Sequence, residues 1–368
     1  MNSFVTMQQI ARQALPQLIE NLVFPNLVYK DFQNDFIGKK GTTIQVKKPV
    51  KYTAADFNGM VSPQEMTEES LTVKLDRIAD VSVEYTTLES ASNVDDLNRL
   101  FVTPAAIALA QKINTDGLML YKAVANCCGT AGTTPGSLSD IAAVRKALNI
   151  AKVPEQGRIA VWDPEADAAF TVIPAIVNAE KSGSVAALRN GSIGRIMGID
   201  HYMSQAVMQH KTGITGSSAV KVNGAVAAGS DTINIDGTKL EGKLVKGDLL
   251  KIGGVCYTVT EDSAEAASNA IAGVKIYPSV PNAVADNADV TLIGDHTANL
   301  AFNPLAFAFV TRPLSTPAGV ESYVTSYNGI SLRVVKGYDM QTKKEMLSMD
   351  VLYDYAPVYP EMAVRVLG

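Results

Sequence analysis

A glycine-rich run at residues 191–198, GSIGRIMG, comes nearest in composition to a ligand-binding loop. Glycines in such loops let backbone N–H groups approach a phosphate closely. The spacing here is G-x-x-G-x-x-x-G, which matches neither the dinucleotide-binding turn nor the P-loop. In addition, no strand pattern leads directly into a helix pattern at this point. We therefore interpret these glycines as turn residues.

Three histidines, His201, His210 and His296, are the only imidazoles that could bind a metal or act as a base. His201 and His210 flank a strand pattern, and no acidic cluster completes a zinc ligand set around them. We expect ordinary surface or interface histidines. The adjacent acids at residues 95–96 and 68–69 do not have the arrangement of an acid–base pair, and no Ser or Cys lies in a nucleophile-elbow pattern.

The three cysteines do not form a disulfide framework, since Cys127 and Cys128 are adjacent in the sequence. We interpret this pair as small buried residues at a helix end, in a protein made and held in a reducing cytosol. The sequence thus offers no catalytic residues, no metal ligands and no cofactor site. This absence favours a protein that is not an enzyme and uses no cofactor.

Composition limits the remaining classes. The chain has 368 residues, of which 47% are hydrophobic and 19% charged, with a formal net charge of -5. That is enough apolar sequence for one large core or several smaller ones. The mild acidity argues against a dedicated nucleic-acid binder, which needs a basic stripe. No run approaches the roughly 20 apolar residues of a membrane span, and residues 1–24 do not have the pattern of a signal peptide.

The first third of the chain predicts elements that lack an obvious core of their own. Residues 5–23 carry an approximately helical apolar stripe, interrupted by Pro16. Residues 43–47, 71–75 and 81–85 alternate polar and apolar side chains, as strands do. The first two read as an extended two-stranded excursion with a polar tip. Because an isolated hairpin is marginal in water, it needs a surface, supplied by its own domain or by another subunit.

A long helix follows, with Thr103 as a possible cap and Pro104 at the favoured first position. Its apolar spacing continues to about residue 126, which predicts a length of roughly 35 Å. Gly129 and Gly132 are expected to end it. From residue 133 to 215 helix and strand patterns alternate, which indicates a mixed α/β domain. One helix is expected at residues 139–148, with Ser139 as a possible cap, and another near residues 176–188.

Residues 216–296 have a different character, because helical spacing disappears. Six short β patterns replace it, at residues 220–222, 232–235, 249–252, 255–259, 274–277 and 290–293. Gly253-Gly254 lies between two apolar runs, as a two-residue hairpin requires. We interpret the segment as an inserted small barrel or sandwich, since α/β-type sequence resumes at Leu300. Strands are expected again at residues 330–335, 345–353 and 362–367. The side chains expected in its core are Val220, Ile233, Ile235, Leu249, Ile252, Val255, Tyr257, Val259, Ile276 and Ile293.

This order of parts resembles the coat-protein branch of tailed-phage major capsid proteins, which have the Hong Kong 97-type fold. The resemblance covers essentially the whole chain. It is carried by VTPAAIALA at residues 102–110, IGRIMGID at 193–200, NLAFNPLAFAFVTRPL at 299–314, GVESY at 319–323 and GISLR at 329–333. No single motif is diagnostic, but their order is.

The resemblance implies an α+β capsid fold with an inserted small β-barrel-like domain. The expected parts are an N-terminal arm (1–33), an extended loop (34–90), a spine helix with peripheral domain (91–132), an axial domain (133–215), the inserted domain (216–297), and the axial return with peripheral strands (298–368). The extended loop is expected to contact a neighbouring subunit. The contact candidates are Ile44, Val46, Lys47, Lys48, Lys51, Phe57, Met60, Leu71, Val73 and Leu75.

The implied function is self-assembly into an icosahedral shell of hexamers and pentamers that encloses the phage genome. The implied partners are further copies of the chain, a scaffolding protein, a portal, and DNA enclosed without sequence-specific binding; no membrane is implied. The expected location is the virion, after assembly in the host cytoplasm. Two alternatives stay open: an encapsulin-type nanocompartment shell, which usually lacks the insertion, and a nucleotide- or sugar-binding α/β enzyme with a β accessory domain.

Overall fold

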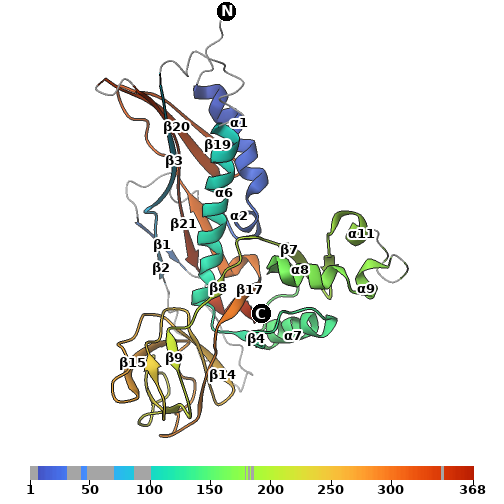
Figure 1. The fold of residues 1–368 in the computed structure, drawn as a ribbon, viewed down its shortest axis with the longest axis vertical. Helices are drawn as coiled ribbons and strands as arrows, with labels where there is room; N and C mark the ends of the chain where they lie inside the picture. The colour runs from blue at the N-terminus through green and yellow to red at the C-terminus, as the bar shows by residue number, and fades with distance from the viewer. Residues whose placement is uncertain are drawn as a thin grey trace, which may run out of the picture. The chain divides into compact units, whose positions relative to one another are not determined.

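The computed structural model describes residues 7–30, 43–47, 70–86, 101–178, 180, 183, 186–340 and 344–368. The chain divides into two compact units. Unit 1 consists of Met1–Pro25, Tyr29–Ile113 and Ala308–Val358. Unit 2 consists of Asn26–Val28, Asn114–Phe307 and Tyr359–Gly368. Figure 1 labels many of the helices and strands of both units.

Unit 1 is built on a five-stranded sheet of long strands, ordered β18-β21-β20-β19 with β3 also paired to β21. The strands are β3 (Arg77–Thr86), β18 (Phe307–Thr311), β19 (Glu321–Tyr327), β20 (Ile330–Asp339) and β21 (Lys344–Pro357). Leu347, Met349 and Val351 alternate along β21 and are all buried, as the period of two in a strand requires. The predicted strands at residues 330–335 and 345–353 are confirmed.

Helix α1 (Met7–Asn21) packs on β19 and β20 of the same unit. Its buried face includes Ile10, Leu15 and Leu18, three residues of the stripe seen in the sequence. Pro16 lies inside the helix. The short helix α2 (Phe24–Leu27) follows, and the Phe24 ring lies against Tyr355 of β21 with ring centroids 5.8 Å apart. The amino-terminal helix therefore covers a sheet of its own chain.

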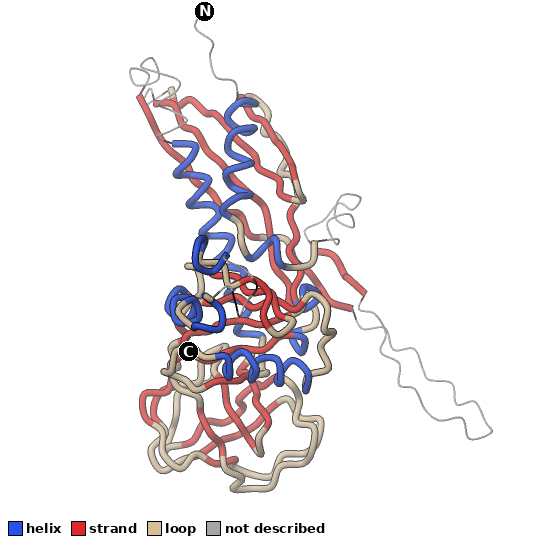
Figure 2. The backbone as a smooth tube through the Cα atoms, turned by 90° about the vertical axis from the view of Figure 1, so that its right-hand side faces the viewer, coloured by secondary structure: helices blue, strands red, loops and turns tan. Residues whose placement is uncertain are grey.

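The predicted hairpin forms, although its tip lies outside the described residues. Strand β1 (Thr43–Lys47) pairs antiparallel with β2 (Ser70–Lys74), with Ile44 opposite Val73 and Val46 opposite Leu71. Figure 2 shows these strands in red beside the sheet of unit 1. The alternation of residues 43–47 and 71–75 thus identified a real strand pair.

The long helix is shorter than its apolar spacing predicts. Helix α6 spans Thr103–Leu118 and continues as the 3₁₀-helix η2, Met119–Ala123. Thr103 is already helical, so it is not the residue before the helix. The chain turns to extended backbone at Val124, and Gly129 ends a strand rather than a helix. The spacing of apolar residues did not distinguish the tighter final turns from α-helix, because both bury every third or fourth residue.

Unit 2 contains a mixed seven-stranded sheet ordered β4-β22-β17-β5-β7-β6, with β8 paired to β17. Its strands are β4 (Cys127–Gly129), β5 (Arg158–Trp162), β6 (Gly194–Ile196), β7 (Ile199–Met203), β8 (Gln209–His210), β17 (His296–Phe302) and β22 (Ala363–Leu367). All five side chains of β5 are buried. For residues 159–162 this matches the continuous apolar sequence, because a strand covered on both faces does not alternate.

Helices α7 (Leu138–Ile150) and α8 (Pro164–Thr171) bury Ile141, Val144 and Phe170 in a cluster with Trp162. The cap of α7 is Ser137, not Ser139, and it forms a capping box with Asp140. The single helix expected near residues 176–188 is instead two short helices among the described residues, α9 (Pro174–Val177) and α11 (Ala186–Asn190).

The β-rich segment forms a six-stranded antiparallel sheet ordered β10-β11-β15-β14-β13-β16. The strands are β10 (Lys221–Val222), β11 (Thr232–Asp236), β13 (Leu249–Ile252), β14 (Val255–Val259), β15 (Ala270–Tyr277) and β16 (Val290–Leu292). A separate pair joins β9 (Ile214–Gly216) to β12 (Glu241–Gly242). Each of the six predicted β runs is therefore a strand.

Most of the predicted core of this segment is confirmed. Seven of the expected side chains share one buried cluster: Val220, Ile233, Ile235, Ile252, Tyr257, Val259 and Ile276. Leu249 is buried outside that cluster, and Ile293 is half-buried. The prediction that Val255 lies in the core was wrong, since its side chain is 38% exposed. Val255 follows the Gly253-Gly254 turn directly and pairs with Ile252, and the first residue after a tight turn lies at the rim of the sheet.

Candidate functional site

The sequence predicted one candidate contact surface, on the extended loop. The structure describes the side chains of two of its ten contact candidates. Val73 and Leu75 are 2% and 1% exposed and form a cluster with Val310, Ala356 and Leu352 of unit 1. These two side chains therefore pack on their own chain. The hairpin thus has at least part of the surface that it was expected to need.

The other contact candidates are not described at side-chain level. Ile44, Val46, Lys47 and Leu71 lie in the paired strands β1 and β2. Lys48, Lys51, Phe57 and Met60 lie outside the described residues. Contact with a neighbouring subunit stays a prediction for these eight residues.

The glycine-rich run forms a β-hairpin. Strands β6 and β7 pair antiparallel with Ile196 opposite Ile199, and Met197 and Gly198 between them both have positive φ. Such a two-residue turn with positive φ at both positions is the type that matches the twist of the strands. The interpretation of turn glycines is confirmed, since here they shape a turn between strands.

The three histidines are buried, which corrects the expectation of surface histidines. His201 accepts a hydrogen bond at Nδ1 from the Trp162 indole N–H, 2.8 Å away. Burial lowers the pKa of His201 to about 4, so the ring stays neutral near pH 7. His210 and His296 lie together elsewhere in unit 2, with ring centroids 5.2 Å apart. Their local sequence gave no sign of this, because the contacts that bury them come from distant segments.

A buried polar cluster surrounds Arg365 on β22. The Arg365 guanidinium donates to the backbone carbonyls of Gly247 (2.7 Å) and Tyr121 (2.6 Å) and to that of Val124 (3.2 Å). It also lies over the Tyr121 ring, 4.9 Å from the centroid, a favourable cation–π geometry. This one side chain therefore joins the carboxyl-terminal strand, the end of η2 and the β-rich segment.

His210 and Asp248 extend the cluster. His210 Nε2 lies 2.8 Å from Asp248 Oδ1, and His210 Nδ1 lies 3.0 Å from the Tyr121 hydroxyl. The second Asp248 oxygen accepts from the Val245 backbone N–H at 2.8 Å. The acid comes from the β-rich segment, whereas His210 and Tyr121 come from β8 and η2. The cluster thus lies at the junction between the six-stranded sheet and the rest of unit 2.

The electrostatics of the cluster follow from its burial. Burial lowers the pKa of Arg365 to about 9, opposed by the nearby Tyr121 and Asp248. Burial and the positive Arg365 lower the pKa of His296 to about 4. Burial also raises the pKa of the Tyr121 hydroxyl. Near pH 7 the arginine is charged while His296 is neutral. Three backbone carbonyls and a carboxylate therefore stabilise one buried cation, as buried charges require.

A disulfide crosses the same junction. Cys127 of β4 is bonded to Cys256 of β14, with Cα atoms 6.5 Å apart and a sequence separation of 129 residues. This corrects the interpretation of the cysteines, which placed Cys127 and Cys128 at a helix end without a disulfide. Cys128 is a free thiol. The spacing of cysteines could not reveal the bond, because its second half lies in a segment that only the fold brings near.

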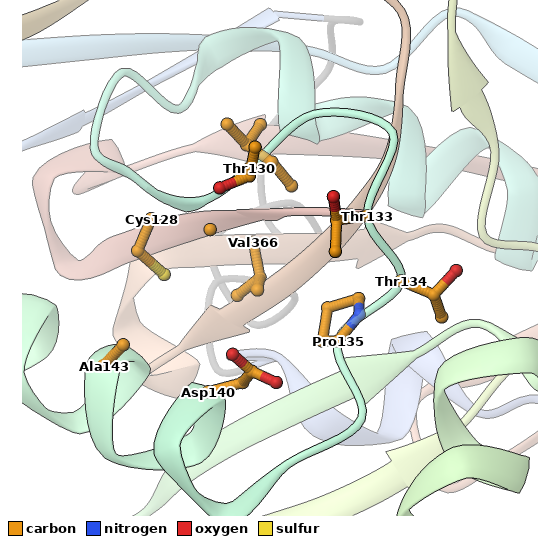
Figure 3. A pocket seen from close by; sticks show the side chains of 10 residues that line it. Cys128, Thr130, Thr133, Thr134, Pro135, Asp140, Ala143 and Val366 are labelled. Carbon is orange, nitrogen blue, oxygen red and sulfur yellow. The ribbon is translucent and has the colours of Figure 1, made fainter.

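A small pocket of about 90 Å³ lies beside Cys128, lined by Thr130, Thr133, Pro135, Asp140 and Val366 among others (Figure 3). Sites for small organic ligands usually measure about 300–1,000 Å³. The Asp140 carboxylate is also occupied, since it accepts from the backbone N–H groups of Gly136 and Ser137 in the capping box. This pocket is thus too small for a typical substrate, and its one carboxylate is already hydrogen-bonded within the capping box.

Within the described ranges, no group of three or more His, Cys, Asp or Glu side chains is arranged to hold a metal ion. None of the helices among those residues is both long enough and apolar enough to cross a membrane.

Known proteins resemble this chain along its whole length. Residues 250–368 match the family described as P22 coat protein - gene protein 5. The chain is 22% identical over 427 aligned residues to a protein named "Major capsid protein" from Acyrthosiphon pisum secondary endosymbiont phage 1. That alignment covers 98% of this chain and 97% of the relative.

Solved structures resemble it as well. A chain from Mycobacterium phage Che8 matches with a TM-score of 0.54 at 16% identity, covering 94% of this chain and 90% of that one. A chain from the capsid of the cyanophage P-SCSP1u matches with a TM-score of 0.47 at 12% identity, covering 94% and 88%. The match to the Che8 structure shows a common fold.

Proposed function

We propose that this chain, whose α+β structure is the Hong Kong 97-type capsid fold, is the major capsid protein of a bacteriophage. It self-assembles into an icosahedral shell and is a structural protein of the virion rather than an enzyme. The observation that carries this proposal is the alignment to a phage protein named "Major capsid protein", because it runs through 98% of this chain and 97% of the relative. The common fold with the Che8 chain supports it independently.

The finer architecture belongs to the same proposal. The subunits form hexamers and pentamers, assembled in the host cytoplasm with a scaffolding protein and a portal, around DNA held without sequence-specific contacts. The net charge of -5 supports the proposal for DNA, since an acidic chain does not bind phosphates strongly. The arm, extended loop, spine helix and axial domain correspond to residues 1–33, 34–90, 91–132 and 133–215, with the axial return at 298–368.

Residues 216–297 are an inserted, barrel-like domain. The support is a cluster of sixteen buried side chains, all from residues 220–290, that packs around one six-stranded sheet. The β9–β12 pair begins at Ile214, so the domain starts about two residues earlier than its sequence pattern suggests. Its junction with the axial domain contains the Arg365 cluster.

The extended loop contacts a neighbouring subunit through its tip and outer strand. Val73 and Leu75 fix the base of the hairpin on unit 1, which leaves the remaining candidates to reach outward. Lys47, Lys48 and Lys51 pair with acids of the neighbour. Exposed pairs contribute only about 0–1 kcal/mol each, so they set register more than affinity.

The test is assembly of the purified protein. The chain is expressed alone and together with the scaffolding protein of its phage, and the products are separated by sedimentation and examined by negative-stain electron microscopy. Closed shells or capsomers are expected. A species that stays strictly monomeric under all assembly conditions contradicts the proposal.

A further inference from the structure

The two adjacent cysteines of β4 face opposite sides of the strand. Successive side chains alternate in a strand, and the parallel register places Cys127 beside Arg365 and Cys128 beside Val366 of β22. Cys128 and Val366 pack with the apolar cluster of α7, and Figure 3 shows the Cys128 side chain on that side. Cys127 is therefore on the face that carries Arg365, toward Cys256 of the β-rich segment.

Non-covalent contacts already hold the two sides of this junction together. The Thr258 hydroxyl, two residues beyond Cys256, donates to the Lys122 carbonyl at 2.9 Å. Arg365 donates to the Gly247 carbonyl at 2.7 Å, and His210 contacts Asp248. Because β4 and β14 are held by these contacts, the Cys127 and Cys256 Cα atoms are 6.5 Å apart, within the range that a disulfide spans.

We propose that Cys127 and Cys256 form a redox staple, which stays open as two thiols during assembly and closes as a disulfide after the particle leaves the cell. The proposal rests on the capsid function, because only a released virion passes from the reducing cytosol to an oxidising medium. Structural disulfides are rare in the cytosol and persist outside it. The staple joins the six-stranded sheet to the seven-stranded sheet of unit 2 once assembly is complete.

Closure is a thiol–disulfide exchange with a low-molecular-weight disulfide such as oxidised glutathione. One protein thiolate attacks the oxidant, forms a mixed disulfide and releases one glutathione thiolate. The second protein thiolate then displaces the other glutathione. Overall, Cys127–SH, Cys256–SH and one oxidised glutathione give the protein disulfide and two reduced glutathiones. The two protein sulfurs are oxidised by two electrons, and the glutathione disulfide is reduced by the same two.

Cys128 does not compete in this exchange. It lies on the other face of β4, packed against the α7 cluster. Burial raises the pKa of its thiol to about 12, so almost none of it is thiolate near neutral pH. Since the thiolate is the reactive species, pairing is directed to Cys127 and Cys256.

The experiment follows the thiols from the cell to the particle. Cells are treated with N-ethylmaleimide before lysis, and purified particles are exposed to oxidised glutathione or kept in reductant. Each sample is then denatured, labelled with a second maleimide and mapped by mass spectrometry. We expect Cys127 and Cys256 to be alkylated in cells, and the buried Cys128 to react only with the second maleimide after denaturation. After oxidation only Cys128 should be free, with one cross-linked peptide pair containing Cys127 and Cys256.

Variants separate the staple from general damage. C128S is expected to form the cross-link normally, and C256S to lose it. Oxidation is expected to raise the midpoint of heat disruption of wild-type and C128S particles by at least about 4 °C, with no change in C256S. Reduced wild-type particles and C256S particles should then behave alike.

Three results overturn the proposal: a Cys127–Cys256 bond already closed in alkylated cells, no bond after oxidation, or a bond that includes Cys128. The cross-link can be mapped on unassembled subunits as well as on particles. Failure to form shells would therefore contradict the capsid function, while the thiol map of the subunit would still decide the staple.

Discussion

Arg365 is fully buried on β22, and removing it from water is costly unless its donors are satisfied. Its guanidinium donates to the carbonyls of Tyr121 and Val124 at the end of η2 and to that of Gly247 in the β-rich segment. A substitution would leave these carbonyls buried without that donor. A buried acceptor left without a donor costs about 1–3 kcal/mol. Arg365 should therefore contribute more to stability than an arginine that is exposed on a strand.

We predict that Arg365→Met, which keeps much of the side-chain volume, lowers the free energy of unfolding by about 2–4 kcal/mol. Removing the buried charge offsets part of the loss in unfolding free energy. The expected loss is therefore smaller than the sum for three buried carbonyls that each lose a donor. Arg195→Met is the control, because Arg195 is 57% exposed and only 3.9 Å from Asp200, so less than about 1 kcal/mol is expected. Urea unfolding of the subunit measures both; equal effects would show that the cluster does not stabilise the junction.

The buried histidines predict an acid-sensitive stability. The pKa values of His201 and His296 are about 4 in the folded chain, against about 6.5 in an unfolded one. Below pH 6.5 the unfolded chain binds protons that the folded chain does not. Stability is therefore full above pH 6.5, falls as the pH drops toward 4, and levels off below pH 4. The total loss is about 3 kcal/mol per histidine.

His201→Gln should remove one share of this loss, about 2 kcal/mol between pH 7.5 and pH 4.5, because a glutamine oxygen can still accept from Trp162 but does not titrate there. Tyr202→Gln, at the exposed neighbouring position, should keep the full pH dependence. The measurement is the urea midpoint at a series of pH values. An unchanged pH profile for His201→Gln would show that His201 is charged, or exposed, in the folded protein.

At the residue scale, features that repeat along the sequence, such as alternation in a strand, could be predicted, whereas contacts between distant residues could not. The core of the β-rich segment could be predicted because Ile233 and Ile235 alternate along one strand, a local signal. The positions of Cys127, His210 and Arg365 could not, because their partners lie 129, 38 and 244 residues away. The resemblance to a family of shells also gave no indication of this cluster.

At the element scale, the β1–β2 pair determines what can be removed without unfolding the chain. Its register runs from Thr43 opposite Lys74 to Lys47 opposite Ser70, and Val73 and Leu75 attach its base to unit 1. Residues 58–68 lie between the two strands and outside the described residues. Shortening the connection costs little, since loop-closure entropy changes slowly with length.

We predict that deleting residues 58–68 leaves the subunit folded, with an unchanged circular dichroism spectrum, and impairs shell formation or the heat resistance of the shells. The reason is the contact with a neighbouring subunit that we propose for this loop. Replacing the same residues by a glycine–serine segment of equal length is the control that separates loop length from loop side chains. Normal shells with normal heat resistance from the deletion would mean that the tip makes no inter-subunit contact that matters.

The elements also show where patterns were ambiguous. The Gly253-Gly254 hairpin was predictable, because two glycines between apolar runs supply the two positive φ values that such a turn needs. The end of the long helix was not, since η2 preserves the apolar spacing of α6. The helix expected near residues 176–188 divided into α9 and α11, a boundary that apolar periodicity alone does not mark.

At the scale of the whole molecule, the β-rich segment combines a core of its own with strong ties to its host. Its sixteen-residue cluster draws on residues 220–290 alone. Burying each such side chain contributes about 1.5–3 kcal/mol, whereas ordering the backbone costs roughly 1–2 kcal/mol per residue. These side chains alone do not offset the backbone entropy of the whole segment. Ladder hydrogen bonds and partial burial elsewhere must supply the rest, so the independent stability of the segment is expected to be marginal.

We predict that the excised fragment of residues 212–294 is soluble and folds, with dispersed amide resonances in its NMR spectrum. The fragment retains the β9–β12 pair and the Gly253-Gly254 hairpin, but it loses the host partners of Asp248 and Cys256. It should accordingly unfold at a lower urea concentration than the same segment in the full chain. Ile235→Ala is the matched control: Ile235 is fully buried in the cluster, so its truncation should cost about 2–5 kcal/mol and abolish the dispersion. A random-coil spectrum from the unsubstituted fragment would mean that the segment folds only on the rest of unit 2, and that the junction around Arg365 is required to form the six-stranded sheet at all.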